Sequence, residues 1–354
     1  MIAPLQLPAV AHWRCRMPAL PKRQSRGRAV GLCGGEMVGA TVGSGWRETP
    51  CWWPGGLPAP IPGGVHKRFV VARAGGGDIA GYWTRTDGGA GGALGWRLHD
   101  GHLDLRELHP ASGWEWTRAL GAGGGCVVGY GKPKAARGQR ALERALCWTV
   151  DGQMIELPAL EAGSEALAQG ADGAWVVGQS GQAQGQVAVL WSCDGRGAVA
   201  LGSRGVISEA WGVADGQQVG YFWARGGARA ALWHGTAALL VDLTPAGSSD
   251  ARALGCGAGL QVGVATPQRQ MRSGGTNPLV RAGIWAGSAS SWVDLQAVLP
   301  SPWNASCALA VGRFGNVLRV VGEAQQVVME AEGTRQERYF LAAQVPVIWE
   351  TSID

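Results

Sequence analysis

The chain has 354 residues, of which 46% are apolar and 16% are charged, a balance that is typical of a globular protein and excludes intrinsic disorder. Much of the net charge of +5 lies in the first 28 residues, so a dedicated nucleic-acid binder is not indicated. No apolar run reaches the length of a membrane span. The 59 glycines predict many tight turns, and the 18 tryptophans predict one recurring structural position.

The N-terminal segment, residues 1–27, is expected to be a basic tail that is either disordered or adds an edge strand. It lacks the positively charged beginning of a signal peptide, and Pro4 and Pro8 interrupt its apolar stretch, so it is a poor signal peptide. A cytoplasmic location is favoured, and an extracellular one follows if the start codon is misplaced.

A short apolar run that ends in glycine recurs along the rest of the chain. The glycines are Gly39, Gly81, Gly129, Gly178, Gly220, Gly263 and Gly322. The spacing of these glycines, 42 to 59 residues, fits a propeller blade better than the shorter repeat of a solenoid.

A tryptophan after a small or apolar pair follows each of the first six glycines. These residues are Trp53, Trp96, Trp148, Trp191, Trp233 and Trp285. In the seventh copy Tyr339, Phe340 and Leu341 are expected to take this position. Asp-Gly or Gly-Gly pairs lie between the runs and predict tight hairpin turns, so each unit reads as four antiparallel strands.

The fold class is therefore all-β, a seven-bladed β-propeller of four-stranded antiparallel blades over residues 28–354. The units span approximately 28–64, 65–112, 113–162, 163–205, 206–248, 249–303 and 304–354. The third-strand tryptophans are expected to pack between blades, and the ring is expected to close without exchange of a strand between the termini. Counts of six or eight blades stay open, because the seventh unit is the most degenerate.

The units resemble the bacterial HAF extracellular repeat family, whose pattern is loosely G-Q-V-V-G, then H-A-F-L-W, then a D-L strand. Residues 213–220, Ala230–Trp233 and Val241–Leu243 follow this pattern, although the His-Ala-Phe triplet is missing. The resemblance covers roughly residues 28–345 and implies a propeller-like, often exported protein without an assigned reaction.

Binding residues are expected on the face of the ring that carries the longer loops, around the central channel, because loops on a rigid scaffold commonly carry function. The candidates are basic or aromatic: Lys132, Lys134, Arg137, Arg140, Tyr221, Trp223, Arg225, Arg229, Arg269, Arg272, Trp114, Trp116 and Trp303. Such a surface suits an acidic glycan, a small acidic ligand or an acidic protein. The alternative is a solvated rim with incidental arginines.

No catalytic set stands out, because the sequence contains no G-x-S-x-G motif. Isolated carboxylates could still meet at the channel mouth, and the candidates are Glu48, Asp87, Glu165, Glu209 and Asp250. The eight cysteines have no zinc-site spacing and are expected to be buried free thiols. His99, His102 and His109 lie close in sequence, but two of them flank a turn, so no metal and no cofactor is predicted.

The function expected from these features is a non-catalytic binding scaffold for a protein or an acidic ligand, present as a monomer. One alternative is a propeller enzyme that acts on a polysaccharide or glycoside through carboxylates. The other alternative is a structural or surface repeat protein.

Overall fold

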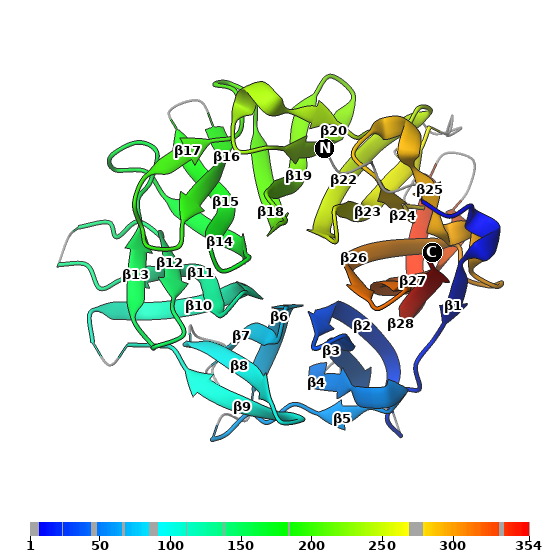
Figure 1. Ribbon diagram of the computed structural model, residues 1–354, viewed down its shortest axis with the longest axis horizontal. Helices are drawn as coiled ribbons and strands as arrows, with labels where there is room; N and C mark the ends of the chain where they lie inside the picture. The colour runs from blue at the N-terminus through cyan, green and yellow to red at the C-terminus, as the bar shows by residue number, and fades with distance from the viewer. Residues whose placement is uncertain are drawn as a thin grey trace.

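A computed structural model describes residues 7–22, 24–43, 48–65, 68–84, 91–110, 112–136, 139–182, 185–268, 279–332 and 336–353. The fold is all-β, and its sheets stand in a ring around a central opening (Figure 1). This confirms the predicted class, a propeller-like ring of antiparallel sheets.

The strands form six hydrogen-bonded sheets, one of eight strands and five of four. The eight-stranded sheet contains β2 (Gln24–Cys33), β3 (Glu36–Gly43), β4 (Glu48–Trp53), β5 (Ala59–Pro60), β6 (Phe69–Gly75), β7 (Asp78–Trp83), β8 (Ala93–His99) and β9 (His102–Glu107). Next come β10 (Trp114–Gly123), β11 (Cys126–Pro133), β12 (Arg144–Trp148) and β13 (Met154–Leu157), and then β14 (Ala166–Ala171), β15 (Trp175–Gln182), β16 (Gly185–Ser192) and β17 (Ala198–Ala200).

The remaining three sheets complete the ring. They are β18 (Ser208–Ala214), β19 (Gln217–Ala224), β20 (Gly227–Trp233) and β21 (Val241–Asp242); β22 (Ser248–Gly257), β23 (Leu260–Pro267), β24 (Arg281–Trp285) and β25 (Val293–Asp294); and β26 (Ala305–Phe314), β27 (Val317–Glu332), β28 (Gln336–Ser352) and β1 (Arg14–Arg16). Short 3₁₀ turns occur at Val10–His12 (η1), Pro54–Gly56 (η2), Ala237–Leu239 (η3), Ala289–Ser291 (η4) and Leu295–Val298 (η5). Among the described residues, no helix has the length and apolar character needed to cross a membrane.

The predicted count of seven sheets is not matched, because β2 and β6 are hydrogen-bonded to each other. They meet through a single parallel pair, Gly31 with Ala74, at the innermost edge of the ring. A β-carbon on Gly31 would collide with the backbone of Ala74, so the glycine permits this close approach. The join merges what would otherwise be two four-stranded sheets into one of eight strands.

The recurring glycine lies on the second strand of each unit, opposite an irregularity in the first strand. In the fifth unit, for example, Gly220 pairs with Ala210, and the register shifts between Ala210 and Gly212. A β-carbon at Gly220 would meet the carbonyl oxygen of Glu209. The same collision, with the carbonyl of the first strand, recurs at the other six glycines of the set. The glycine is therefore required by a β-bulge that is repeated around the ring.

The third-strand tryptophans are core residues, as predicted. Each of the six is at most 1% exposed, and Trp96 and Trp191 donate their indole N–H to the carbonyls of Pro62 and Pro158. The prediction for the seventh copy is wrong, because Trp349 occupies this position and is fully buried. Val320 pairs with Trp349 in the register in which Val176 pairs with Trp191.

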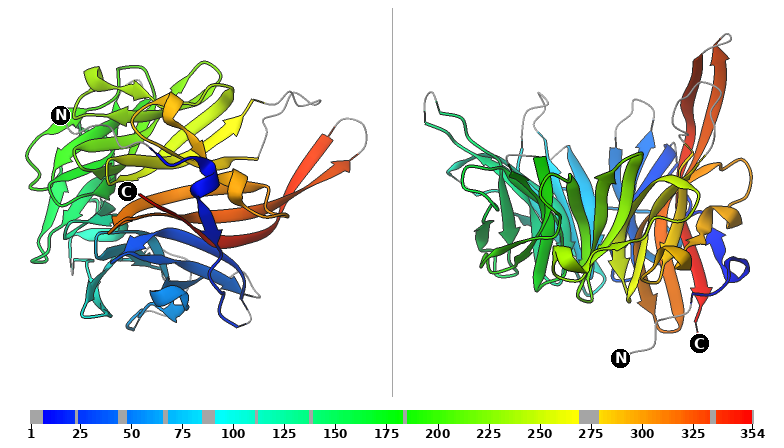
Figure 2. Two further views of the ribbon diagram at one scale, coloured as in Figure 1. Left: turned by 45° about the vertical axis from the view of Figure 1, so that its right-hand side comes forward. Right: turned by 90° about the horizontal axis from the view of Figure 1, so that it is seen from above.

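The strands β27 and β28 form a hairpin much longer than its counterparts, and it projects beyond the ring on the face away from the C-terminus (Figure 2). This extra length displaces Trp349 from the place that the repeat spacing predicts. Tyr339, Phe340 and Leu341 lie in the projecting part instead.

Ring closure differs from the prediction that no strand is exchanged between the termini, although the N-terminal segment does add an edge strand, one of the two expectations for residues 1–27. The outer strand of the last sheet is β1, whose residues Arg14 to Arg16 pair antiparallel with residues 350 to 348 of β28. Trp13 is buried in the core of this sheet, and the side chain of Thr351 donates a hydrogen bond to the carbonyl of His12. The N-terminal segment therefore completes the blade that carries the C-terminus. The first regular strand after it, β2, begins at Gln24.

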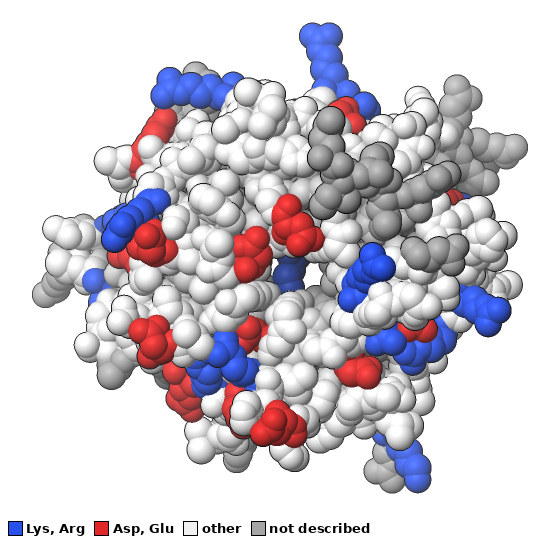
Figure 3. Space-filling view, in the orientation of Figure 1, with Lys and Arg blue, Asp and Glu red and all other residues white. Residues whose placement is uncertain are grey.

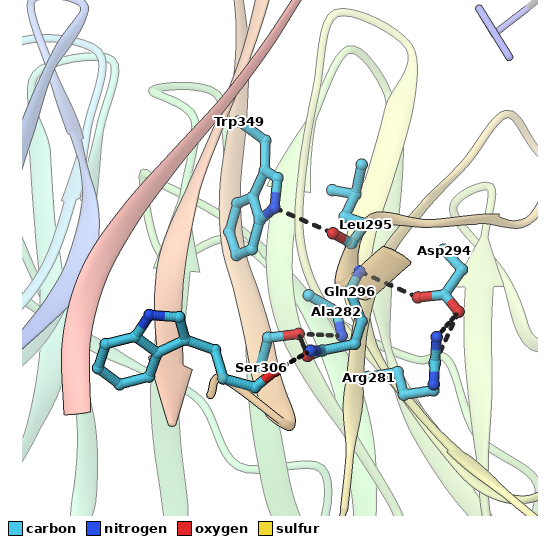
Figure 4. Close-up of polar contacts among 8 residues, drawn as sticks. Arg281, Ala282, Asp294, Leu295, Gln296, Ser306 and Trp349 are labelled. Atoms are coloured by element: carbon cyan, nitrogen blue, oxygen red, sulfur yellow. Dashed lines mark hydrogen bonds and ion pairs between the residues drawn. The ribbon is translucent and has the colours of Figure 1, made fainter. Parts of the chain in front are cut away.

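Neighbouring sheets are joined by a recurring hydrogen bond as well as by apolar packing. The side-chain oxygens of Thr117, Ser208 and Ser306 on first strands accept the backbone N–H of Ala93, Ala188 and Ala282 on the preceding third strands. Figure 4 shows the last of these contacts, where the Ser306 hydroxyl also donates to Gln296 at 2.6 Å. The indole of Trp349 reaches across the same seam to the carbonyl of Leu295 at 3.1 Å.

Candidate functional site

The ring has two faces with different loops. The turn face carries the tight turns from first to second and from third to fourth strands, and the loop face carries the other connections together with the β27–β28 hairpin. Figure 3 looks onto the turn face, where acidic and basic side chains surround the central opening.

A cavity of about 370 Å³ occupies the turn-face end of the channel. Its wall is built from the ends of first strands, and most lining residues are glycine or alanine, because the strands converge there and leave little room. Asp172, Asp215 and Arg313 stand in this lining, so the mouth carries charges of both signs.

Arg73 is the charged group deepest in this wall. Its guanidinium donates to the carbonyl of Trp211 on the far side of the channel and lies 5.8 Å from the centre of the Trp211 ring. Burial lowers the pKa of Arg73 to about 10. The side chain thus spans the channel and narrows it.

On the loop-face side, arginines on first strands lie against aromatic rings of neighbouring strands. The guanidinium of Arg118 is 5.2 Å from the ring centres of both Tyr82 and Trp116, and it donates to the Tyr130 hydroxyl at 3.3 Å. Trp116 and Tyr130 form an edge-to-face pair at 5.3 Å. These cation–π contacts fix a polar, aromatic surface on the inner wall of the third unit.

A second arginine and aromatic group lies on the fifth and sixth units. Arg252 is 5.1 Å from the Tyr221 ring, and Tyr221 contacts both Trp211 and Trp223 with centroid distances of 6.5 Å. Burial and a hydrogen bond with Glu209 raise the pKa of the Tyr221 hydroxyl, so this hydroxyl stays protonated at neutral pH. Tyr221 and Trp223, both predicted from the sequence, therefore meet in one cluster.

Three other predicted residues line a single cavity of about 420 Å³ on the loop face. They are Trp116, Lys132 and Arg140. Lys132 forms an ion pair with Glu115 at 2.9 Å, and Arg140 forms one with Glu165 at 3.3 Å. The positive charge that was expected to bind an acidic ligand is thus largely neutralised by carboxylates in this cavity.

The same cavity contains Glu143 beside Glu165. Burial and the neighbouring Glu165 raise the pKa of Glu143, while Arg118 and Lys132 oppose that shift. Sequence reasoning did not select Glu143, because no motif surrounds it.

The remaining predicted binding residues do not join these groups. Arg229 is paired with Asp242 at 3.0 Å, and Trp303 lies at the end of the sixth unit, where its carbonyl accepts a hydrogen bond from Gln296. Trp114 is part-buried beside the core of the third unit, Lys134 follows β11, and Arg225 lies in the turn after β19. Arg137, Arg269 and Arg272 lie outside the described residues.

Four of the five carboxylates predicted as catalytic candidates have a structural partner. Glu48 binds Arg28 at 2.9 Å, Glu209 accepts from the Trp211 indole at 3.0 Å, and Asp250 accepts from the backbone N–H of Ala228 at 3.1 Å. Glu165 is paired with Arg140 as described above, and Asp87 lies outside the described residues.

The histidines are also separated in their contacts. His99 and His102 face each other across the β8–β9 turn, whereas His109 is 2.9 Å from the Thr117 hydroxyl. Burial lowers the pKa of His109, with Lys134 contributing. His99 and His102 therefore belong to a hairpin turn, and His109 belongs to a contact between neighbouring sheets.

Sequence reasoning missed the inner-wall arginines, Arg28, Arg118 and Arg252. All three occupy the equivalent position on first strands, the residue whose carbonyl faces the recurring glycine. Counting one residue back from the small first-strand residues Ala29, Ala119 and Ala253 would have found them.

Comparison with known proteins finds structures with a similar fold but no matching sequence. No protein-family model and no curated sequence matches the chain. A puromycin hydrolase of known structure is similar with a TM-score of 0.58 and 16% identity, over 91% of this chain and 54% of that one. A puromycin-hydrolyzing peptidase of Mycobacterium tuberculosis gives 0.51 and 13%, over 92% and 55%. An acylaminoacyl peptidase of Pyrococcus horikoshii gives 0.51 and 11%, over 89% and 52%.

These similarities show a shared fold, and the chain spans about half the length of the proteins it matches. They overturn the function predicted from the sequence, a binding scaffold with a polysaccharide enzyme or a structural repeat as alternatives. The three solved proteins named above share the fold over about nine-tenths of this chain; they are two peptidases and a hydrolase, and the fold occupies only part of each.

Proposed function

We propose that this chain is the propeller part of a peptide-hydrolysing protein and works with a hydrolase domain. The observation that carries the proposal is the alignment of nearly all of this chain with about half of several amide-hydrolysing enzymes. The sequence offers no nucleophile motif, and four of its five candidate carboxylates hold structural contacts. The chemistry would then belong to the hydrolase, and the propeller would bind it and shape access to it.

The loop face is the better docking surface for such a domain. The projecting β27–β28 hairpin carries Val328 and Phe340 as a cross-strand pair, and both are more than one-third exposed. Apolar side chains exposed on a projecting hairpin favour a protein contact. The predicted loop-face residues, Trp116, Lys132 and Arg140 among them, would line this contact, and their paired charges suit a protein surface better than a small acidic ligand.

We also propose that the ring has seven blades and that the units belong to the HAF type of repeat. In support, the eight-stranded sheet is joined in its middle by one parallel pair alone. Each half of that sheet has its own first-strand bulge, second-strand glycine and third-strand tryptophan.

The proposal can be tested with the tagged chain isolated from cells that make it naturally and with the purified recombinant chain. Hydrolysis of puromycin and of an aminoacyl amide should accompany the natural isolate and be absent from the recombinant chain alone. Replacing both Val328 and Phe340 with Asp should remove the activity from the isolate. The control is Val199→Asp, because Val199 is equally exposed but lies on the outer strand β17.

Two results would contradict this function. One is amide hydrolysis by the folded recombinant chain itself, which would make the chain the enzyme. The other is a natural isolate that lacks hydrolase activity while the chain is intact.

A further inference from the structure

Three of the eight cysteines meet at one point of the ring although they are far apart in sequence. The sulfur atoms of Cys126, Cys147 and Cys193 all lie within 4.8 Å of one another. They come from the start of β11, the end of β12 and the residue after β16, so the cluster joins two neighbouring sheets. No sequence spacing could reveal it, because the three cysteines come from separate places in the chain.

The cluster lies near the turn face and not in the centre of the core. Each of the three residues adjoins a tight turn on that face, and Cys193 is only half-buried. Cys147 is fully buried and Cys126 nearly so, among the apolar side chains shared by the two sheets. An ion could thus enter from solvent and be held against the apolar side chains of the two sheets.

Strand register makes a disulfide between the first two cysteines unfavourable. Cys147 pairs with Val128, so Cys126 is its diagonal neighbour on the same side of the sheet. Diagonal residues are about 7–8 Å apart at their Cα atoms, beyond the roughly 4.4–6.8 Å that a disulfide allows. A bridging ion has no such limit, because bonds of about 2.3 Å from zinc to sulfur place the sulfurs roughly 3.8 Å apart.

The turn before Cys126 is held in place by the neighbouring sheet. Asp78 accepts the backbone N–H of Gly125 at 3.0 Å and binds Arg97 at 2.8 Å, which ties the turn before Cys126 to the neighbouring sheet. Outer contacts of this kind are usual around metal ligands.

We propose that Cys126, Cys147 and Cys193 form a site for one thiophilic metal ion, with Zn²⁺ as its occupant and water in the remaining position. Three thiolates select soft or borderline ions over hard ones such as Mg²⁺. With Zn²⁺ the site carries one net negative charge, which the nearby Arg97 partly offsets. Each thiol loses its proton on binding, so one ion releases up to three protons and no electron is transferred. The ion would clamp the two sheets together.

The test is metal binding by the reduced full-length chain. Equilibrium dialysis against Zn²⁺ should give one ion per chain, and Cd²⁺ should give a thiolate charge-transfer band in the ultraviolet. Bound Zn²⁺ should protect three thiols from a thiol reagent and raise the melting temperature in proportion to the logarithm of its concentration.

Variants locate the site within the chain. Cys193→Ser should weaken Zn²⁺ binding at least tenfold, and because Cys193 is half-buried this variant should still fold. The control is Cys51→Ser, a buried thiol whose contact is the Thr41 hydroxyl. It should bind Zn²⁺ like the unchanged chain.

The proposal fails if Cys193→Ser and Cys51→Ser bind Zn²⁺ equally well. It also fails if the reduced chain takes up no metal while mass spectrometry of the isolated protein shows a disulfide involving Cys193. Either result would be independent of the proposed role beside a hydrolase, because it involves no peptide substrate.

Discussion

At the scale of single residues, the recurring glycine and tryptophan have opposite roles in each blade. The glycine lets a first-strand carbonyl occupy the place of a β-carbon, and the tryptophan fills the wider space farther from the axis. Both were visible in the sequence, because a steric need that recurs in every unit leaves a periodic signal. The bulge that requires the glycine was not visible, since it is a property of backbone pairing.

A substitution tests this steric role of the glycine. Gly220→Ala places a methyl group against the Glu209 carbonyl, so the strands must separate, and we expect a loss of about 1–3 kcal/mol in unfolding free energy. Gly77→Ala is the matched control, because Gly77 has open space around the position of a β-carbon and no left-handed backbone. Urea denaturation of both variants measures the difference, and equal stability would refute the steric argument.

At the scale of elements, tight turns were the most predictable feature. Asp100-Gly101 and Asp215-Gly216 both have positive φ at their two central positions, as a type I′ hairpin requires. An added edge strand was one expectation for residues 1–27, but its place in the last blade, beside β28, was not predictable. Its pairing joins residues at opposite ends of the chain, and the unusual length of β27 and β28 hid the position of Trp349.

The closing strand gives the second prediction. Trp13 anchors β1 in the core that contains Trp349, so Trp13→Ala should cost about 3–5 kcal/mol and release β1 from β28. Hydrogen exchange should then accelerate in residues 348–350 of β28 before other strands. Val10→Ala serves as the control, because Val10 is exposed in η1, and it should change stability by less than about 0.5 kcal/mol. Unchanged exchange in Trp13→Ala would mean that β1 does not close the ring.

At the scale of the whole molecule, stability is shared between neighbours and not held within each unit. One apolar cluster joins Leu190 of the fourth unit with Trp233 of the fifth, and another joins Leu232 of the fifth with Trp285 of the sixth. The candidate sites follow the same rule, since their residues come from different units. Sequence periodicity could identify the units but not which side chains meet across their seams, and this is why the inner-wall arginines and the cysteine cluster were missed.

If contacts between neighbouring units stabilise the ring, its thermal stability should depend little on where the chain begins and ends. A circular permutant that begins at Gly205, in the turn between β17 and β18, with the old ends joined by a flexible linker, should melt within a few degrees of the parent. The linker would connect segments that flank neighbouring strands, because Arg14 at the start of β1 pairs with Glu350 near the end of β28. Deleting residues 206–248 instead removes one partner from two shared clusters, so we expect loss of the cooperative thermal transition. Calorimetry distinguishes the two designs, and a deletion variant as stable as the parent would show that the units fold independently of their neighbours.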